Sequence, residues 1–165
     1  MGNIIAIDPG LSNGVAVLTP SRELLFAGEI ETVGDGANRR LNLSVLKSLC
    51  EKLDISEAVI EDVAAMPGQG VSSMFRFGRA TGSLEGGLQV LGLSLEFVRP
   101  AVWKKSIGAK AKSTEDIRAL ALQRWPNMAD RFSRKKDHSR AEAALIGAWY
   151  IQKYLGPQTK EQENA

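Results

Sequence analysis

Three acidic residues from distant parts of the chain lie beside apolar segments that read as strands or a helix. Asp8 ends the apolar run 3–7, Glu61 ends the run 58–60, and Glu142 lies in the first turn of the last expected helix. If the first and fourth strands are parallel neighbours, Asp8 and Glu61 project from the same edge of the sheet. Carboxylates gathered in one place raise each other's pKa unless a cation neutralises them, and Mg²⁺ or Mn²⁺ prefers such hard oxygen ligands. A pair of these ions about 3.5–4 Å apart can activate water and stabilise a leaving oxygen, so the pattern predicts phosphodiester cleavage.

Each acid also has a purely structural interpretation. Asp8 precedes Pro9-Gly10, a setting typical of an Asx-turn, and Glu61 could be a surface charge at a strand end. Glu142 could complete a capping box that begins at Ser139. Asp62 competes with Glu61, but the alternation of a strand sends the two side chains to opposite faces, so only one can join the cluster.

Asp137 and His138 precede Glu142 in the sequence. The residue at which the last helix begins decides which of the two side chains faces Glu142. Positions 138 and 142 lie about 40° apart on a helix, whereas 137 and 142 lie about 140° apart. If the helix includes residue 137, His138 shares the face of Glu142; if it begins at Ser139, Asp137 can turn toward the site from the loop. A neutral imidazole can bind a metal or act as a general base. Both residues therefore remain candidates for catalysis and for metal binding, and a polar residue at a helix entry is the alternative.

Charge is distributed unevenly along the chain. The net charge is +2, yet residues 103–136 contain ten basic and three acidic residues, so the rest of the chain is acidic. A basic block beside an acidic site is typical of a protein that handles a polyanion, although a solvated surface has the same composition. The residues expected to contact nucleic acid in this block lie after the fifth expected strand or just before the last helix: Lys104, Lys105, Lys110, Lys112, Arg134, Lys135 and Lys136.

The order of expected elements predicts an α/β fold. Residues 3–7, 14–18 and 24–30 read as strands joined by short turns, which makes an antiparallel meander. A helix over 38–53 then leads to the fourth strand, which must therefore run parallel to a neighbour. A long helix over 72–91, a strand over 94–98, and helices over 113–125 and 141–155 complete a mixed five-stranded sheet flanked by helices.

The long helix contains glycines at a spacing of four residues: Gly78, Gly82 and Gly86. They line one face, where a backbone could approach closely. Packing of that face on the sheet, a dimer seam and a groove for DNA are the alternatives.

Length and composition exclude several classes of protein. A chain of 165 residues suits one domain, for which we expect the bounds 1–156, with a polar flexible tail over 157–165. No apolar run reaches the roughly 20 residues that a membrane helix needs, and the amino terminus lacks the basic segment of a signal peptide. The single cysteine, Cys50, rules out a disulfide framework and a thiolate zinc site within this chain. We therefore expect a cytoplasmic protein with no membrane association.

Five segments, in order, resemble those of one family. Residues 4–16 (IIAIDPGLSNGVA) resemble the opening of RuvC-like Holliday-junction resolvases, members of the ribonuclease H-like superfamily. Residues 59–63 (VIEDV) are similar to the second carboxylate strand of that family, and 72–87 to the long helix that follows. Residues 98–104 (VRPAVWK) resemble the next strand and its basic turn. Residues 137–146 (DHSRAEAALI) are similar to the closing acidic helix, particularly that of phage-type members.

The resemblance implies a ribonuclease H-like fold and a crossover-junction endodeoxyribonuclease active in recombination and repair. Such an enzyme is a homodimer that depends on Mg²⁺ or Mn²⁺, binds four-way DNA junctions and nicks opposing strands. Asp8 and Glu61 then correspond to the first two metal-binding carboxylates and Glu142 to the last, with His138 or Asp137 as the remaining ligand.

The resemblance also gives the basic and aromatic residues roles. Lys112 is the lysine expected nearest the scissile phosphate, and Arg76 and Arg79 of the long helix are expected to contact DNA. Some relatives open the junction with an aromatic side chain just beyond the second acidic strand. This chain has 64–67 (AAMP) there, so Phe75 is the candidate.

Three other functions share parts of this pattern. An actin-like or sugar-kinase ATPase also begins with a strand, an aspartate and a glycine turn, but it needs two such domains. Another ribonuclease H-like nuclease, acting on RNA–DNA hybrids or structured RNA, could use the same acids. A branched-DNA-binding protein without catalysis is the third alternative, although the acidic set argues against it.

Overall fold

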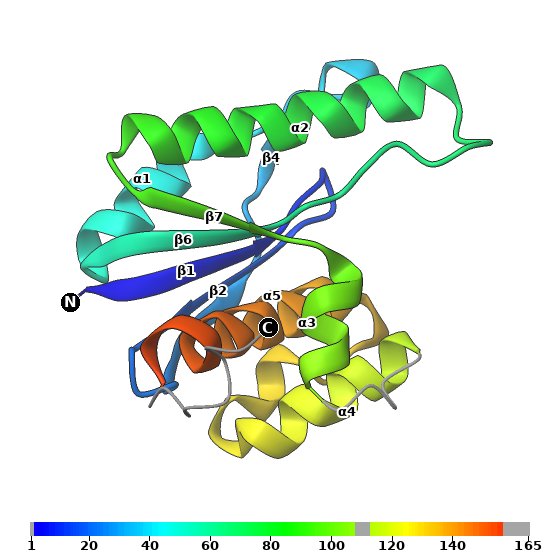
Figure 1. The fold of residues 1–165 in the computed structure, drawn as a ribbon. Helices are drawn as coiled ribbons and strands as arrows, with labels where there is room; N and C mark the ends of the chain where they lie inside the picture. The colour runs from blue at the N-terminus through cyan, green and yellow to red at the C-terminus, as the bar shows by residue number, and fades with distance from the viewer. Residues whose placement is uncertain (1, 108–112, 157–165) are drawn as a thin grey trace, which may run out of the picture.

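A mixed β-sheet forms the centre of the molecule (Figure 1). The computed structural model describes residues 2–107 and 113–156, and within these ranges five strands form one sheet in the order β3-β2-β1-β6-β7. Strand β1 (Asn3–Asp8) pairs antiparallel with β2 (Gly14–Leu18) and parallel with β6 (Ile55–Glu61). The outer strands are β3 (Leu24–Gly28), antiparallel to β2, and β7 (Ser94–Val98), parallel to β6. The predicted sheet is confirmed.

The register of the two central strands decides where the acidic residues lie. Ile7 pairs with Ile60, so the next residue of each strand, Asp8 and Glu61, reaches the same edge of the sheet. Asp8 also pairs with Gly14 across the antiparallel turn. The helix before β6 predicted a parallel neighbour for that strand, and because the neighbour is β1, the two carboxylates lie side by side.

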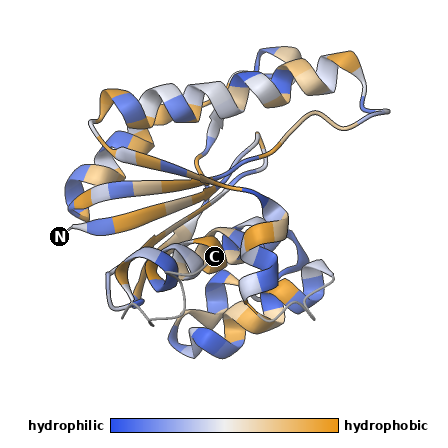
Figure 2. Cartoon of the chain, in the orientation of Figure 1, coloured by the Kyte–Doolittle hydropathy of each residue, from blue (hydrophilic) through white to orange (hydrophobic). Residues whose placement is uncertain are grey.

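Helices cover both faces of this sheet. Helices α1 (Leu43–Lys52) and α2 (Val71–Val90) pack on one face, and α3 (Pro100–Ser106), α4 (Thr114–Arg124) and α5 (His138–Tyr150) lie on the other (Figure 1). Hydropathy follows this layering, with apolar residues concentrated along the strands (Figure 2). Alternate residues of β1 enter different cores, because successive side chains of a strand point to opposite faces: Ile4 and Ala6 pack with α5, and Ile5 and Ile7 with α1 and α2.

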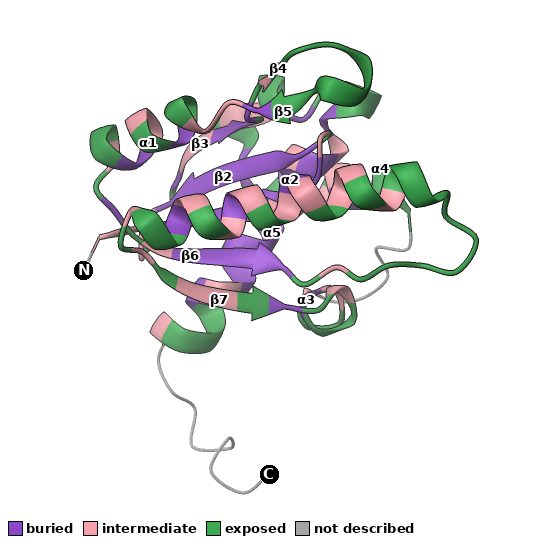
Figure 3. Ribbon diagram, turned by 90° about the horizontal axis from the view of Figure 1, so that it is seen from above, coloured by how far each residue is buried: buried purple, intermediate pink, exposed green. Residues whose placement is uncertain are grey.

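Helix α2 lies across the sheet with only one face buried (Figure 3). Ala80, Leu84 and Leu88, spaced by four residues, form that buried face. The predicted glycine stripe, Gly78, Gly82 and Gly86, faces away from the sheet. A Cβ built at any of the three would meet no atom within 4 Å in the described part of the chain. Close packing on the sheet is therefore not the reason for these glycines.

The last helix is longer than predicted at its amino-terminal end. It begins at His138, directly after a 3-10 helix (Lys135–Asp137), and it continues as a π-helix (Ile151–Leu155). Most residues of α5 are buried, and a Cβ at Gly147 would overlap Leu18 of β2. The helix that carries Glu142 is thus seated directly on the sheet.

Three short elements differ from the prediction. The helix expected over 38–53 begins only at Leu43, because a 3-10 helix (Gly36–Asn38) and a small hairpin of β4 (Thr32–Val33) and β5 (Arg40–Leu41) precede it. The third strand ends at Gly28, two residues early.

Lys104 and Lys105, expected in a loop, lie on α3. Pro100 begins that helix, because its fixed φ suits the first helical position. By contrast, the predicted start of α4 is confirmed: Asp116 N–H donates to Ser113 Oγ at 3.1 Å, and Ser113 N–H donates to Asp116 Oδ2 at 3.0 Å.

Two expectations concern the extent and the surroundings of the chain. The predicted polar tail, 157–165, lies outside the described residues. Among the helices within the described ranges, none is both long and apolar enough to cross a membrane.

Candidate active site

The three predicted carboxylates meet where β1, β6 and α5 converge. Asp8 and Glu61 end adjacent strands, and Glu142 lies in the second turn of α5. The negative charges of Glu142 and Glu61 both act on Asp8, and Glu142 acts on Glu61 as well. Helix α5 can come this close because residue 14 is glycine: a Cβ there would overlap the backbone of Ser139.

Asp8 is held at the centre of this cluster. Burial is the main reason that its pKa lies well above its ordinary value, and the charges of Glu142 and Glu61 raise the pKa further. A hydrogen bond from Ser139 opposes this rise, whereas a hydrogen bond with Glu142 adds to it. The negative charge crowded around Asp8 is therefore a feature that a bound cation would relieve.

Glu61 is fixed by an indole. Its side chain is buried, and Trp103 Nε1 donates a hydrogen bond of 2.7 Å to Glu61 Oε1. Burial is the main cause that raises the pKa of Glu61; the bond from Trp103 lowers it, Glu142 raises it and Lys104 lowers it. Trp103 comes from α3, so this helix orients a carboxylate that belongs to β6.

Lys104 supplies a positive charge at the cluster. Lys104 Nζ lies 3.1 Å from Glu142 Oε1 and 5.1 Å from the centre of the Trp103 ring. The lysine was predicted to bind DNA, and its position next to Glu142 puts it at the carboxylates themselves.

The three carboxylates suit a hard divalent cation, but two of them contact neighbouring side chains of α3. In the described ranges, no three His, Cys, Asp or Glu side chains already form a metal-binding group. Glu61 is turned to Trp103 and Glu142 to Lys104. Burial and neighbouring carboxylates raise the pKa values of Asp8 and Glu61. A group of carboxylate oxygens of this kind is stabilised by Mg²⁺ or Mn²⁺, so the residues fit such an ion by their chemistry.

His138 lies at the rim of this site, at the first position of α5. Its Nε2 is 3.4 Å from Ser139 Oγ, and it lines a polar cleft of about 550 Å³ together with Asn13, Glu29 and Arg39. No interaction between the imidazole and Asp8 or Glu142 is found in the described residues. Ser139, one residue later, is the side chain that reaches Asp8.

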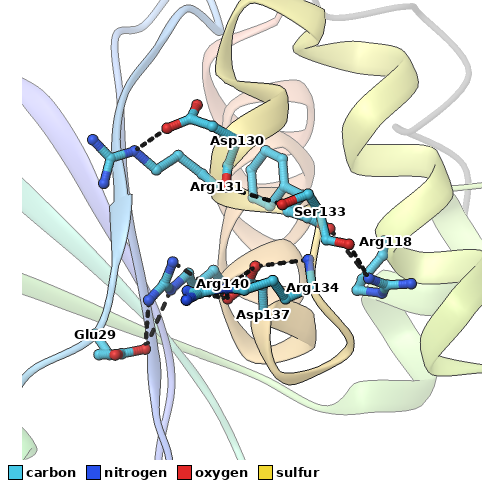
Figure 4. Close-up of polar contacts among 9 residues, drawn as sticks. Glu29, Arg118, Asp130, Arg131, Ser133, Arg134, Asp137 and Arg140 are labelled. Carbon is cyan, nitrogen blue, oxygen red and sulfur yellow. Dashed lines mark hydrogen bonds and ion pairs between the residues drawn. The ribbon is translucent and has the colours of Figure 1, made fainter.

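Asp137 is engaged by arginines (Figure 4). Its side chain is 1% exposed, and Arg134 Nη2 lies 2.8 Å from Oδ1 while the Arg134 backbone N–H donates to Oδ2 at 2.9 Å. Arg140 Nη1 lies 3.4 Å from Oδ1, and Arg140 also binds Glu29 at 2.9 Å. Burial alone would raise the pKa of Asp137, but the Arg134 hydrogen bonds and the two positive charges outweigh it, and the pKa lies below its ordinary value. Asp137 thus anchors the start of α5.

Several residues predicted to contact DNA surround the carboxylates. Lys105 is exposed on α3, and the basic run 134–136 leads into α5. Phe75 is 67% exposed on the first turns of α2, where the guanidinium of Arg79 lies 5.5 Å from its ring centre. Arg76 lies one residue further along the same helix. Lys110 and Lys112 fall outside the described residues.

Sequence reasoning missed two side chains that orient the carboxylates. Trp103 reads as an apolar core residue, and only the packing of α3 turns its N–H toward Glu61. Ser139 was considered only as the start of a capping box; the helix begins one residue before it, which frees its hydroxyl for Asp8. Its position three residues before Glu142 was the available signal, because such residues share a helix face.

Comparisons with known proteins agree with this topology. No protein-family model and no curated protein sequence matches the chain. Among solved structures, Thermus thermophilus RuvC in complex with a Holliday-junction substrate is similar, with a TM-score of 0.65 and 14% identity over 93% of this chain and 97% of that one. A second Thermus thermophilus RuvC structure gives a TM-score of 0.56 at 13% identity, over 92% and 96% of the two chains. The chain therefore has a RuvC-like fold, with the mixed sheet and flanking helices of the ribonuclease H-like class.

Proposed function

We propose that this protein is a metal-dependent endonuclease that resolves four-way DNA junctions by hydrolysing phosphodiester bonds. The convergence of Asp8, Glu61 and Glu142 at one sheet edge carries the proposal. The RuvC-like fold supports it, since a solved structure of that fold contains a Holliday-junction substrate.

The three carboxylates are the proposed ligands of Mg²⁺ or Mn²⁺. When bound, such an ion supplies an activated water and stabilises the leaving oxygen of the phosphodiester. Trp103 orients Glu61 through the bond to Oε1, and Ser139 orients Asp8. The positive charge of Lys104 offsets the negative charge of Glu142. This lowers the electrostatic repulsion between the site and an incoming phosphate.

His138 and Asp137 have different places in the proposal. His138 remains a candidate for a general base or a further ligand at the rim, because its ring is next to Ser139 and lines the cleft there. Asp137 is left out, because Arg134 and Arg140 bind its carboxylate.

The DNA path proposed here crosses the surface around the carboxylates. Lys105 and the basic run 134–136 are the phosphate contacts, which hold DNA without reading its sequence. A cleft of about 1080 Å³ between the loop after β6, the start of α2 and the start of α3 is the proposed seat of the junction centre. Its lining includes Met66 and Phe77, and the exposed ring of Phe75 is the proposed wedge.

A homodimer would supply the second nick. The outward face of α2 carries the small residues Gly78, Gly82 and Gly86. The first and last residues of the helix, Val71 and Val90, are exposed apolar side chains. A second copy of the helix could approach this face closely, because glycine has no side chain, so we assign the dimer seam to it.

The decisive experiment compares cutting of three substrates in Mg²⁺: a synthetic four-way junction, a linear duplex and an RNA–DNA hybrid. We expect symmetrical nicks in the junction and an intact linear duplex. Asp8→Asn should abolish cutting and retain binding, because it removes a metal ligand. Asp54→Asn, the same change at an exposed position beyond the opposite end of the sheet, is the matched control.

Three outcomes would contradict the proposal in different ways. Equal cutting of linear and branched DNA would leave a nuclease without junction selectivity. Preferred cutting of the hybrid would favour an RNA-directed ribonuclease H-like enzyme. Binding of the junction without any cutting would favour a branched-DNA-binding protein.

A further inference from the structure

Four arginines gather on the surface beside the site. Arg39 and Arg40 belong to the β4–β5 hairpin, and Arg76 and Arg79 to the amino-terminal half of α2. The hairpin and the helix lie next to each other (Figure 3), so residues some 40 positions apart form one arginine cluster.

The cluster is held in place by backbone carbonyl groups. Arg79 Nη2 donates to the carbonyl oxygens of Ala37 and Arg39, both at 3.1 Å. Arg40 Nη1 donates to the same two oxygens, at 3.4 and 3.1 Å. Arg39 donates from Nε and Nη2 to Thr32 Oγ1 at 3.3 and 3.1 Å. These contacts fix the hairpin to α2 and position the guanidinium groups, but they neutralise none of the four charges.

The arginine cluster carries four positive charges. In the described ranges, the ion pairs involve other residues, and none joins a carboxylate to any of the four arginines. Desolvation and then the charges of Arg40 and Arg76 lower the pKa of Arg79. Keeping like charges together costs free energy, and an anionic ligand would offset that cost.

A polar cleft connects the cluster to the candidate active site. The cleft of about 550 Å³ is lined by Arg39 on the hairpin side and by Lys136, His138 and Ser139 at the start of α5. Glu29 and Glu31 also line it, but Arg140 pairs with Glu29 at 2.9 Å. The cleft thus leads from the arginine cluster to Ser139, the residue that hydrogen-bonds Asp8.

We propose that the arginine cluster is a phosphate-binding surface that holds the backbone of one duplex arm of the branched DNA. The inference rests on the proposed function and extends it to the β4–β5 hairpin. Guanidinium groups bind phosphate oxygens in a bidentate manner, and the cleft gives a strand held at Arg39 a path to Ser139, next to the carboxylates. Because contacts of this kind go to phosphates, the surface adds affinity and salt dependence without sequence preference.

The test is a double variant, Arg39→Ala/Arg40→Ala, with junction binding measured by fluorescence anisotropy in EDTA, where no cutting occurs. Each phosphate contact contributes about 0.9 to the slope of log K against log salt. We therefore expect the slope to fall by about 1.8, and the Kd at 0.1 M salt to rise by about 10- to 60-fold. Arg40→Ala alone should lower the slope by about 0.9.

Two further variants separate phosphate contacts from general effects. Lys47→Ala/Lys52→Ala removes two exposed positive charges from α1 and should keep the wild-type slope and a Kd within about twofold of wild type. Arg39→Lys/Arg40→Lys keeps the charge and should restore most of the slope even if the alanine variant is poorly folded. Single-turnover cutting in Mg²⁺ at saturating junction should match wild type in Lys47→Ala/Lys52→Ala, since that variant alters neither the arginine cluster nor the carboxylates.

Failure of the inference differs from failure of the proposed function. If wild type binds and cuts junctions while Arg39→Ala/Arg40→Ala keeps the wild-type slope, the cluster does not bind phosphate and the proposed function stands. An equal loss in the α1 control would also overturn the inference, because net charge alone would explain it. If wild type neither binds nor cuts junctions, both proposals fall.

Discussion

The link between Asp137 and its two arginines should make a large, pH-dependent contribution to stability. Asp137→Asn keeps the size of the side chain but removes the charge that Arg134 and Arg140 bind. Breaking a buried ion pair costs about 3–5 kcal/mol when the partner stays buried. The Arg134 side chain is 52% exposed and can regain water, so we expect a loss of about 2–4 kcal/mol in the free energy of unfolding. For a domain of this size, that loss corresponds to a fall of about 5–15 °C in Tm.

The sign of the pH dependence follows from the lowered pKa of Asp137. An acid whose pKa is lower in the folded state stabilises the fold above its unfolded pKa of about 3.9. That stabilisation disappears as the pH falls through the folded pKa. The difference between wild type and Asp137→Asn should therefore be constant from about pH 6 to 8 and shrink below about pH 4.

Urea denaturation across this pH range measures the difference. The matched control is Asp130→Asn, which breaks an exposed pair with Arg131 of 3.3 Å and should cost about 0.5 kcal/mol or less. If Asp137→Asn costs no more than this control, or if its cost stays the same at acidic pH, Asp137 does not anchor α5 as described.

The remaining predictions concern the packing around the carboxylates. Gly14→Ala should lower Tm and slow junction cutting, because its Cβ overlaps the backbone of Ser139; wild-type values in both assays would refute the close approach. Gly86→Ala adds a Cβ at the proposed dimer seam, where it meets no atom within 4 Å in the described residues of its own chain, so it should weaken the dimer and lower its urea-unfolding free energy; an unchanged dimer in sedimentation velocity would refute the seam. Trp103→Phe should lower that free energy by about 1.5–3 kcal/mol, because it leaves Glu61 without its indole donor; an unchanged value would refute the role of the bond.

The sequence was sufficient to predict the sheet and to single out the three carboxylates that the structure brings together, because strands and their ends follow from short-range patterns. Apolar runs with turn residues between them indicate strands, and a helix before the fourth strand favours a parallel pairing of that strand with a neighbour. Once β1 and β6 are parallel neighbours, Asp8 and Glu61 must share an edge. The start of the helix after Ser113 was equally local.

The contacts that orient the carboxylates were not predictable in the same way. The indole of Trp103 reaches Glu61 only because Pro100 starts a helix where a basic loop was expected. The direction of Asp137 depends on arginines three residues away on either side, and either orientation was compatible with its sequence position.

The arginine cluster could not be predicted from local sequence patterns either. The strands of the β4–β5 hairpin have two residues each, too few for an alternating pattern. Its pairing with α2 depends on the contacts of Arg79 with the carbonyl groups of Ala37 and Arg39, which lie far away in the sequence.

Calorimetric titration of Mn²⁺ tests the central claim, which is that the clustered carboxylates form a site for a divalent cation. Wild type should bind Mn²⁺, and Asp8→Asn/Glu61→Gln should bind it at least about tenfold more weakly, because two of three charged ligands are lost. Asp54→Asn/Asp130→Asn, which removes two exposed charges elsewhere, should bind as wild type does. An Mn²⁺ affinity that Asp8→Asn/Glu61→Gln leaves unchanged would contradict the account.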